Sequence, residues 1–125
     1  MTSLFQFGTF DLASGQASDW KIECDNLTQT DWAVLAHLAA QRLAAFNAVV
    51  AVPTGGKPFA IALMEHRTEE ATSLLICDDV LTTGGSMERK REQVRKLTDR
   101  PVFGVCAFAR GPCPNWVIPV WSLDQ

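Results

Sequence analysis

Three short, mainly apolar runs constrain the fold of this chain most strongly. They are AVVAV at residues 48–52, SLLIC at 73–77 and VFGVCAFA at 102–109. Continuous apolar runs of this length are typical of strands that are covered on both faces. The segments between them, 58–64 and 87–97, predict helices, and an alternation of strands and helices indicates a mainly parallel α/β sheet. Ligands of such sheets bind beyond the carboxyl ends of the strands.

The two ends of the chain predict additional strands around this core. Residues 1–25 contain the stretches TFDLA and SDWKIE on either side of the turn SGQA, which predicts a short strand pair. The last apolar segment, WVIPVWSL, predicts a final strand, and its Pro119 favours an edge position. With 125 residues, we expect one domain, in which the strand pair of 1–25 precedes an α/β core at 26–125.

A helix is predicted between the strand pair and the first core strand. Thr28 or Thr30 is a suitable N-cap, and Asp31 would then lie in the first turn. Apolar residues follow at helical spacing from Trp32 to Phe46, so we expect one face of this helix to lie on the core.

Composition excludes several classes of function. The net charge is −3 and there is no basic run, which argues against broad nucleic-acid binding. No apolar run approaches the roughly 20 residues of a membrane span, and the start MTSLFQFGTF lacks the pattern of a signal peptide. Reduced thiols and a cytoplasmic location are therefore expected. The cysteines form no CxxC pair and are Cys24, Cys77, Cys106 and Cys113.

The segment DDVLTTGGS, residues 78–86, combines two acids with a turn of small hydroxyl residues and glycines. The turn leads from a strand into a helix, whose free N–H groups and positive dipole end suit a phosphate. Asp78 and Asp79 would repel a phosphate, and vicinal ribose hydroxyls are a better partner for them. The ligand predicted is a ribose 5-phosphate unit. The alternative is structural, with acids that cap the turn and glycines that only end a loop.

Residues 74–86 closely resemble the phosphoribosyl pyrophosphate motif of type I phosphoribosyltransferases. The resemblance implies that Asp78 and Asp79 hold the ribose hydroxyls and serve catalysis. It also implies that the loop wraps the 5′-phosphate. The implied ribose and 5′-phosphate site consists of Asp78, Asp79, Val80, Leu81, Thr82, Thr83, Gly84, Gly85 and Ser86.

The resemblance also implies a pyrophosphate loop and a magnesium ion. VAVPTGGKPFA lies one strand earlier, where the family has its pyrophosphate loop. Gly55 and Gly56 would present backbone N–H groups there, beside Thr54 and Lys57. An ordinary glycine turn is the alternative. Mg²⁺ would be carried by donor oxygens and keep most of its waters, with Asp78 or Asp79 in contact through water rather than as a direct ligand.

Within the family, the orotate phosphoribosyltransferases are most similar. DLASGQAS matches their L-x-SG-x-x-S strand pair, and FARG places Arg110 after the strand that follows the phosphoribosyl motif. Ser14 and Arg110 would then contact the base. The lysine that usually precedes SG is replaced by Ala13, and Lys21 is the candidate substitute. A surface lysine and a solvated arginine are the alternatives for Lys21 and Arg110.

One departure from the family affects catalysis. These enzymes have a long mobile loop that closes basic residues over the pyrophosphate, whereas only MEHRTEEATS joins the two motifs here. His66 and Arg67 are its positively charged candidates, with Arg67 assigned to pyrophosphate. Two hypotheses therefore follow from the resemblance. One is transfer of 5-phosphoribosyl to a nucleobase, with orotate the first choice, and the other is a non-catalytic or regulatory module that binds the donor or a nucleotide.

A third class of function is a receiver domain that is phosphorylated at Asp78 or Asp79. This function would not explain the threonines and glycines that follow the acids.

The fold expected is a compact three-layer phosphoribosyltransferase-like domain with a shortened hood and mobile loop. The expected partners are phosphoribosyl pyrophosphate and a nucleobase, with no nucleic acid and no membrane. Family members commonly form homodimers, and the edge formed by Trp116, Val117, Ile118 and Trp121 is a candidate interface, although core packing explains these residues equally well.

Overall fold

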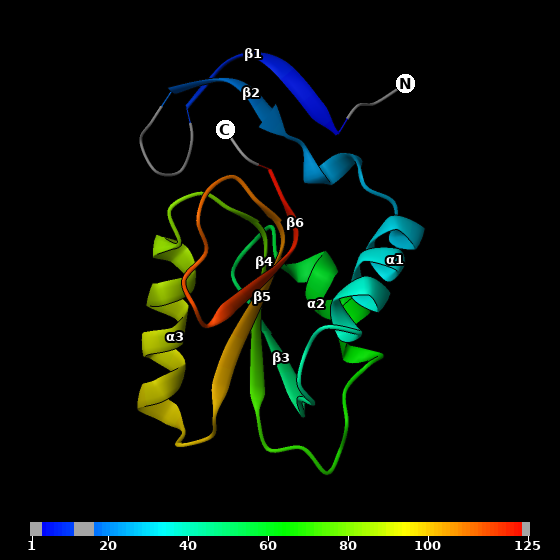
Figure 1. The fold of residues 1–125 in the computed structure, drawn as a ribbon, viewed down its shortest axis with the longest axis vertical. Helices are drawn as coiled ribbons and strands as arrows, with labels where there is room; N and C mark the ends of the chain where they lie inside the picture. The colour runs from blue at the N-terminus through cyan, green and yellow to red at the C-terminus, as the bar shows by residue number, and fades with distance from the viewer. Residues whose placement is uncertain (1–3, 12–16, 124–125) are drawn as a thin grey trace.

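A computed structural model describes residues 4–11 and 17–123 of the chain. Its centre is a four-stranded sheet in the order β3-β4-β5-β6, in which all neighbours are parallel (Figure 1). The predicted parallel α/β fold is confirmed, and Pro119 lies in the edge strand β6 as expected. The strands are β3 (Ala48–Ala51), β4 (Leu74–Leu81), β5 (Val102–Ala109) and β6 (Val117–Ser122).

Helices cover both faces of this sheet and complete the three layers. α3 (Gly85–Leu97) lies on one face, and α1 (Gln29–Ala40) and α2 (Lys57–Met64) lie on the other (Figure 1). Side chains alternate between the faces along each strand. Leu75 and Cys77 therefore join the core beneath α1 and α2, whereas Ile76 joins the core beneath α3.

α1 begins at the capping residues that the sequence supplies. Thr28 and Asp31 form a capping box at α1, since each side chain accepts a hydrogen bond from the other residue's backbone N–H. The helix ends at Ala40, so the prediction of helical spacing up to Phe46 was wrong in extent. Phe46 is buried all the same, because the connection to β3 turns it into the core.

β4 is longer than its apolar run. The prediction placed the strand end at Cys77, but the strand continues through both acids to Leu81. Its pairing with β5 explains the difference, because Asp78 lies opposite Cys106 and Leu81 lies opposite Ala109. The loop that follows is correspondingly short, and α3 begins at Gly85 rather than Met87.

The N-terminal strand pair is present. β1 (Phe5–Asp11) and β2 (Ala17–Ile22) are antiparallel, with an irregularity in the register between Phe7 and Phe10. The pair lies beyond the carboxyl ends of the parallel strands, and the short 3₁₀ helix η1 (Cys24–Asn26) joins it to the core (Figure 1). This places Ile22 above the loops that follow β3, β4 and β5. The division into strand pair and core as parts of one domain stays a prediction.

Three side-chain contacts connect segments that are distant in the sequence. The Trp116 Nε1–H donates to Glu88 Oε1 at 2.7 Å, and the Arg91 guanidinium lies 4.7 Å from the Trp116 ring centroid. On the other face, Arg42 Nη1 donates to the carbonyl oxygen of Pro119 at 2.7 Å. These contacts connect α3 to the segment before β6 and connect the turn after α1 to β6.

Two further expectations concern membranes and thiols. Within residues 4–11 and 17–123, no helix has the length and apolar character that crossing a bilayer requires. The four cysteines are free thiols, and Cys77 and Cys106 are buried in the strands as predicted. Burial raises the pKa of both thiols, which keeps them protonated and chemically inert.

Candidate active site

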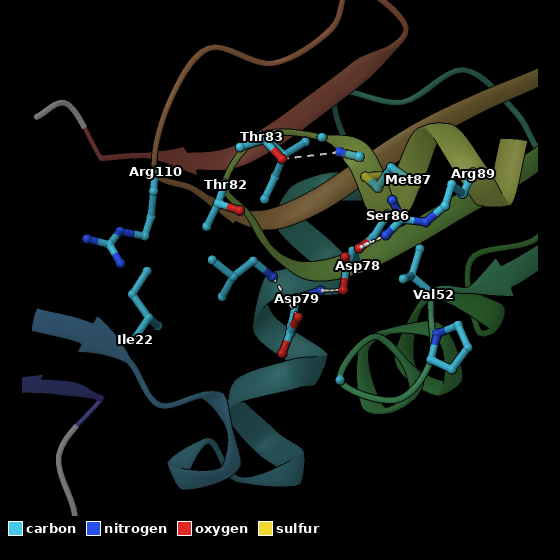
Figure 2. A pocket seen from close by; sticks show the side chains of 16 residues that line it. Ile22, Val52, Asp78, Asp79, Thr82, Thr83, Ser86, Met87, Arg89 and Arg110 are labelled. Carbon is cyan, nitrogen blue, oxygen red and sulfur yellow. Dashed lines mark hydrogen bonds between the residues drawn. The ribbon is translucent and has the colours of Figure 1, made fainter. Parts of the chain in front are cut away.

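A cavity of about 620 Å³ opens at the carboxyl ends of β3, β4 and β5 (Figure 2). This volume is within the usual range for small-molecule sites. The segments that follow β3, β4 and β5 all contribute to it. Together with the end of β4, the first turns of α3 and Ile22, they supply the lining, which is Ile22, Val52, Pro53, Gly55, Asp78, Asp79, Val80, Leu81, Thr82, Thr83, Gly84, Gly85, Ser86, Met87, Arg89 and Arg110.

Asp78 and Asp79 lie side by side at the base of the cavity. The backbone N–H of Asp79 donates to Asp78 Oδ1 at 2.8 Å, and that of Val80 donates to Asp79 Oδ1 at 2.7 Å. Asp78 is only 8% exposed. Burial, a side-chain hydrogen bond with Asp79 and the negative charge of Asp79 raise the pKa of Asp78 to about 8. A carboxyl pair held in this way suits a partner that brings several hydroxyl groups.

The loop at residues 82–86 forms the wall beside the acids. Gly84 precedes the first residue of α3 and has φ +87°, a left-handed conformation that favours glycine. Thr83 Oγ1 accepts a hydrogen bond from the Gly85 N–H at 3.5 Å. No side chain caps α3 through its N-cap residue, Gly84. The helix therefore presents backbone donors and the positive end of its dipole to the cavity, which suits an anion.

The loop after β3 meets the acids from the opposite side. Gly55 lines the cavity and lies against Asp79, because a Cβ on Gly55 would be 2.8 Å from Asp79 Cγ. Gly56 is buried, and its N–H donates to the Val52 carbonyl at 3.1 Å. Thr54 belongs to the same loop and Lys57 is the first residue of α2, but both are exposed and neither lines the cavity.

The residues predicted to contact a base lie in three different situations. Arg110 follows β5 directly, is 8% exposed and lines the cavity, and its N–H donates to the Leu81 carbonyl at 2.8 Å. Lys21 belongs to β2, where its backbone pairs with Gln6. Ser14, with the SG turn around it, lies outside the described residues. The structure thus brings Arg110 to the cavity.

The predicted pyrophosphate residue Arg67 is not brought to this cavity. It follows α2, which runs away from the cavity, and Arg67 pairs with exposed Glu69 at 3.7 Å. The backbone of the next residue, Thr68, donates to Phe46 ahead of β3, and Ser73 accepts from Asn47. The connection 65–73 therefore lies near the amino ends of the strands, at the opposite edge of the sheet (Figure 1). His66 belongs to the same connection.

Sequence reasoning missed the Arg89 side chain at this site. Arg89 lies one helical turn after Ser86, and its Nη2 donates to Ser86 Oγ at 3.2 Å (Figure 2). The signal was available, because residues three apart share a helix face. Starting the helix at Gly85 rather than Met87 would have placed Ser86 and Arg89 on the same face. Ile22, Val52 and Met87 were also missed as lining residues, and they add the apolar surface of the cavity.

Comparisons with known proteins give matches in structure only. No protein-family model and no curated protein sequence matches this chain. The crystal structure of orotate phosphoribosyltransferase from Aeropyrum pernix superposes with a TM-score of 0.77 at 24% identity, covering 96% of this chain and 88% of that one. The enzyme of the same name from Mycobacterium tuberculosis H37Rv gives 0.72 at 16% identity, covering 96% and 90%.

A longer protein contains the same fold. The chain superposes on Leishmania donovani UMP synthase with a TM-score of 0.70 at 20% identity, covering 96% of this chain but 34% of that one. The fold of this chain is therefore the fold of the orotate phosphoribosyltransferases. The resemblance seen in residues 74–86 is confirmed at the level of the fold.

Proposed function

We propose that this protein transfers a 5-phosphoribosyl group from phosphoribosyl pyrophosphate to a nucleobase, with orotate as the first candidate. The observation that supports this most is the arrangement of Asp78 and Asp79 against the loop at 82–86 in one cavity. Two carboxyl groups beside a helix N-terminus match a ligand with vicinal hydroxyls on one side and a phosphate on the other. This assignment makes Asp78 and Asp79 the ribose contacts and 82–86 the 5′-phosphate loop.

The proposed chemistry is a substitution at the anomeric carbon. The bond from this carbon to pyrophosphate breaks, pyrophosphate leaves with the electron pair, and a base nitrogen forms the new bond as it gives up its proton. Residues of the cavity hold the ribose in place and supply electrostatic stabilisation as positive charge develops on the sugar. The acidic pair Asp78 and Asp79 faces that charge, and backbone N–H groups of the loop containing Gly55 and Gly56 are assigned to pyrophosphate.

Arg110 is the proposed base contact. It lies at the cavity wall next to β5, and a guanidinium suits a planar base with carbonyl or carboxylate oxygens. Ser14 and Lys21 remain proposed base contacts from the sequence resemblance alone. Arg67 is not retained for pyrophosphate, because it lies at the other edge of the sheet.

Magnesium enters this proposal with the donor. Among the described residues, no group of three His, Cys, Asp or Glu side chains is placed to hold a metal ion. Two neighbouring carboxyl groups do fit a hydrated Mg²⁺ that is held mainly by phosphate oxygens, since this cation keeps several of its waters. When bound, the ion would neutralise charge on the leaving pyrophosphate. Asp78 and Asp79 would contact its water shell.

A second function is favoured by the position of the connection 65–73. In the family that the sequence resembles, a mobile loop joins the two motifs at this point of the chain. Here the shorter segment 65–73 lies at the edge of the sheet away from the cavity (Figure 1). Loss of a single well-placed electrostatic donor lowers the rate of an enzyme by about 10²–10³. A module that binds the donor or a nucleotide without turnover is therefore the alternative.

Phosphorus NMR distinguishes the two functions. The protein is incubated with phosphoribosyl pyrophosphate and Mg²⁺, alone and with orotate, uracil, adenine, hypoxanthine or guanine. Free pyrophosphate and a new monophosphate signal with one base would establish transfer and identify the acceptor. Shifted donor signals without products would support the binding module. Unchanged donor signals would refute the ligand assignment, and the variant D78N/D79N controls for contaminating activity.

Two broader proposals accompany this function. We propose that the chain forms a homodimer, which sedimentation velocity at several protein concentrations would test. A cytoplasmic location is proposed as well, and imaging of a tagged chain in its own cells would test it.

A further inference from the structure

We infer that Arg89 is a side-chain ligand of the 5′-phosphate and that its charge is a main determinant of affinity for 5′-phosphorylated ribosides. This inference rests on the proposed function, because it uses the same cavity. It adds a contact that the resemblance does not supply, since the phosphate loop at residues 82–86 contains no cationic side chain.

The first observation that supports this inference is the position of the Arg89 guanidinium. Arg89 lines the cavity, and its Nη2 donates to Ser86 Oγ at 3.2 Å. A Cβ on Gly85 would lie 3.4 Å from Arg89 Nη1. The guanidinium therefore lies over the first turn of α3, beside the backbone donors of the loop (Figure 2). An anion at this helix end would meet backbone N–H groups and the guanidinium together.

The neighbours of Arg89 leave its charge facing the cavity. In the parts of the chain that the structure describes, no carboxylate forms a salt bridge with Arg89. The nearest acid in the sequence, Glu88, instead contacts Arg91 at 3.9 Å and accepts from Trp116 at 2.7 Å. In α3, Glu88 therefore contacts Trp116, whereas the next residue, Arg89, contacts the phosphate loop at Ser86.

The charged side chains that line the cavity explain why Arg89 would matter for phosphate affinity. The side chains that line it include two acids, Asp78 and Asp79, and two guanidinium groups, Arg89 and Arg110. Arg110 is at the end of β5, while Arg89 is at the start of α3, so the two lie on either side of the acids (Figure 2). Lys57 and Arg67 do not line the cavity. Among the side chains that the structure describes, Arg89 is therefore the source of positive charge for a phosphate at the α3 end.

Titration calorimetry with ribose 5-phosphate tests the inference directly. This ligand has no pyrophosphate, so the readout does not depend on turnover or on Mg²⁺. R89Q should bind it about tenfold or more weakly than the wild type, which is the usual effect of losing a hydrogen bond between charged groups. R89K should lie between the two, because it keeps the charge without the planar fork. R95Q, at an exposed arginine later on the same helix, is the matched control and should stay within about twofold.

A second readout separates direct contact from a structural effect. Phosphorus NMR follows the titration of bound ribose 5-phosphate, whose second pKa is about 6 in solution. A guanidinium at the phosphate lowers this pKa in the wild type, and R89Q should return it toward the solution value. A role limited to holding Ser86 would leave the pKa of the bound phosphate unchanged in the variant.

The outcomes separate this inference from the proposed function. Equal affinity of R89Q and wild type, or equal losses in R89Q and R95Q, would overturn the contact while leaving the ribose phosphate site in place. Failure of the wild type to bind ribose 5-phosphate and phosphoribosyl pyrophosphate would overturn both. Binding that depends on Arg89 without transfer to any base would support the contact and contradict only the enzymatic proposal.

Discussion

Gly55 and Asp79 approach each other so closely that the glycine has no room for a side chain. A Cβ on Gly55 would lie 2.8 Å from Asp79 Cγ and 2.9 Å from Asp79 Oδ1. The loop after β3 and the acidic end of β4 thus meet at this pair. The loop that we assign to pyrophosphate therefore directly contacts the acids that we assign to ribose.

The variants G55A and G56A should fail in different ways. In G55A the new methyl group displaces the Asp79 carboxyl, so affinity for phosphoribosyl pyrophosphate should fall about tenfold or more with little change in stability. In G56A the methyl group would lie 2.8 Å from the carbonyl oxygens of both Cys77 and Val52. These are backbone atoms of β4 and of the residue that follows β3, so about 1–3 kcal/mol of unfolding free energy should be lost. Calorimetry and urea unfolding of both variants measure this contrast, and similar behaviour of the two would contradict it.

Gly84 and Gly85 should also differ, although they are adjacent. G84A forces an alanine into φ +87°, which should cost about 1–2 kcal/mol of unfolding free energy. Gly85 is the first residue of α3, where an alanine fits helical geometry. G85A should therefore be neutral or up to about 1 kcal/mol more stable in the free protein. Thermal unfolding of the free proteins makes the comparison, and greater destabilisation by G85A would show that the left-handed turn at Gly84 is misassigned.

The variant D78N should stabilise the free protein in a pH-dependent way. The pKa of Asp78 is about 8 in the folded chain, compared with 3.8 for an ordinary aspartate. Between these values the folded protein holds a proton that the unfolded chain releases, so wild-type stability falls as pH rises through this window. Asparagine removes the titration. The gain from D78N should be absent near pH 4 and grow to on the order of 5 kcal/mol at pH 8.

Urea unfolding of D78N and wild type at pH 4.5, 6 and 8 measures this dependence. An increment that is equal at all three pH values would contradict a buried, protonated Asp78. The same variant should bind phosphoribosyl pyrophosphate more weakly, because an amide has one acceptor oxygen where the carboxyl group offers two oxygens to the ribose hydroxyls. Greater stability together with lost binding is the usual signature of a functional acid held in an unfavourable site.

Arg67 should contribute little to donor binding. Its exposed guanidinium pairs with Glu69 at the edge of the sheet away from the cavity. R67A should therefore change the affinity for phosphoribosyl pyrophosphate by less than about twofold, as expected for a distant surface charge. Calorimetry alongside R89Q provides the comparison. A tenfold loss in R67A would mean that the connection 65–73 reaches the donor by another route, such as from a second copy of the chain.

Local pattern was sufficient for much of this protein. The apolar runs predicted the parallel strands, and the candidate N-caps Thr28 and Thr30 predicted the start of α1, which the structure places after Thr28. These signals act between near neighbours in the sequence. The order of acids, threonines and glycines in 78–86 predicted a phosphate loop at a helix N-terminus. Strand ends were less predictable. β4 continues through Asp78 and Asp79 because β5 supplies hydrogen-bonding partners there, and a run of apolar letters contains no information about a partner strand.

The amino-acid pattern was enough to predict the parallel sheet and the residues of the loop beside the cavity. The cations that reach this cavity, in contrast, depend on how the helices pack on the sheet. Lys57, Arg67, Arg89 and Arg110 are equivalent as charges along the chain, but α2 carries Arg67 away from the cavity while the first turn of α3 brings Arg89 to it. The reason is geometric: the direction in which each helix crosses the sheet sets where its side chains lie, and crossing direction depends on contacts between segments far apart in the sequence.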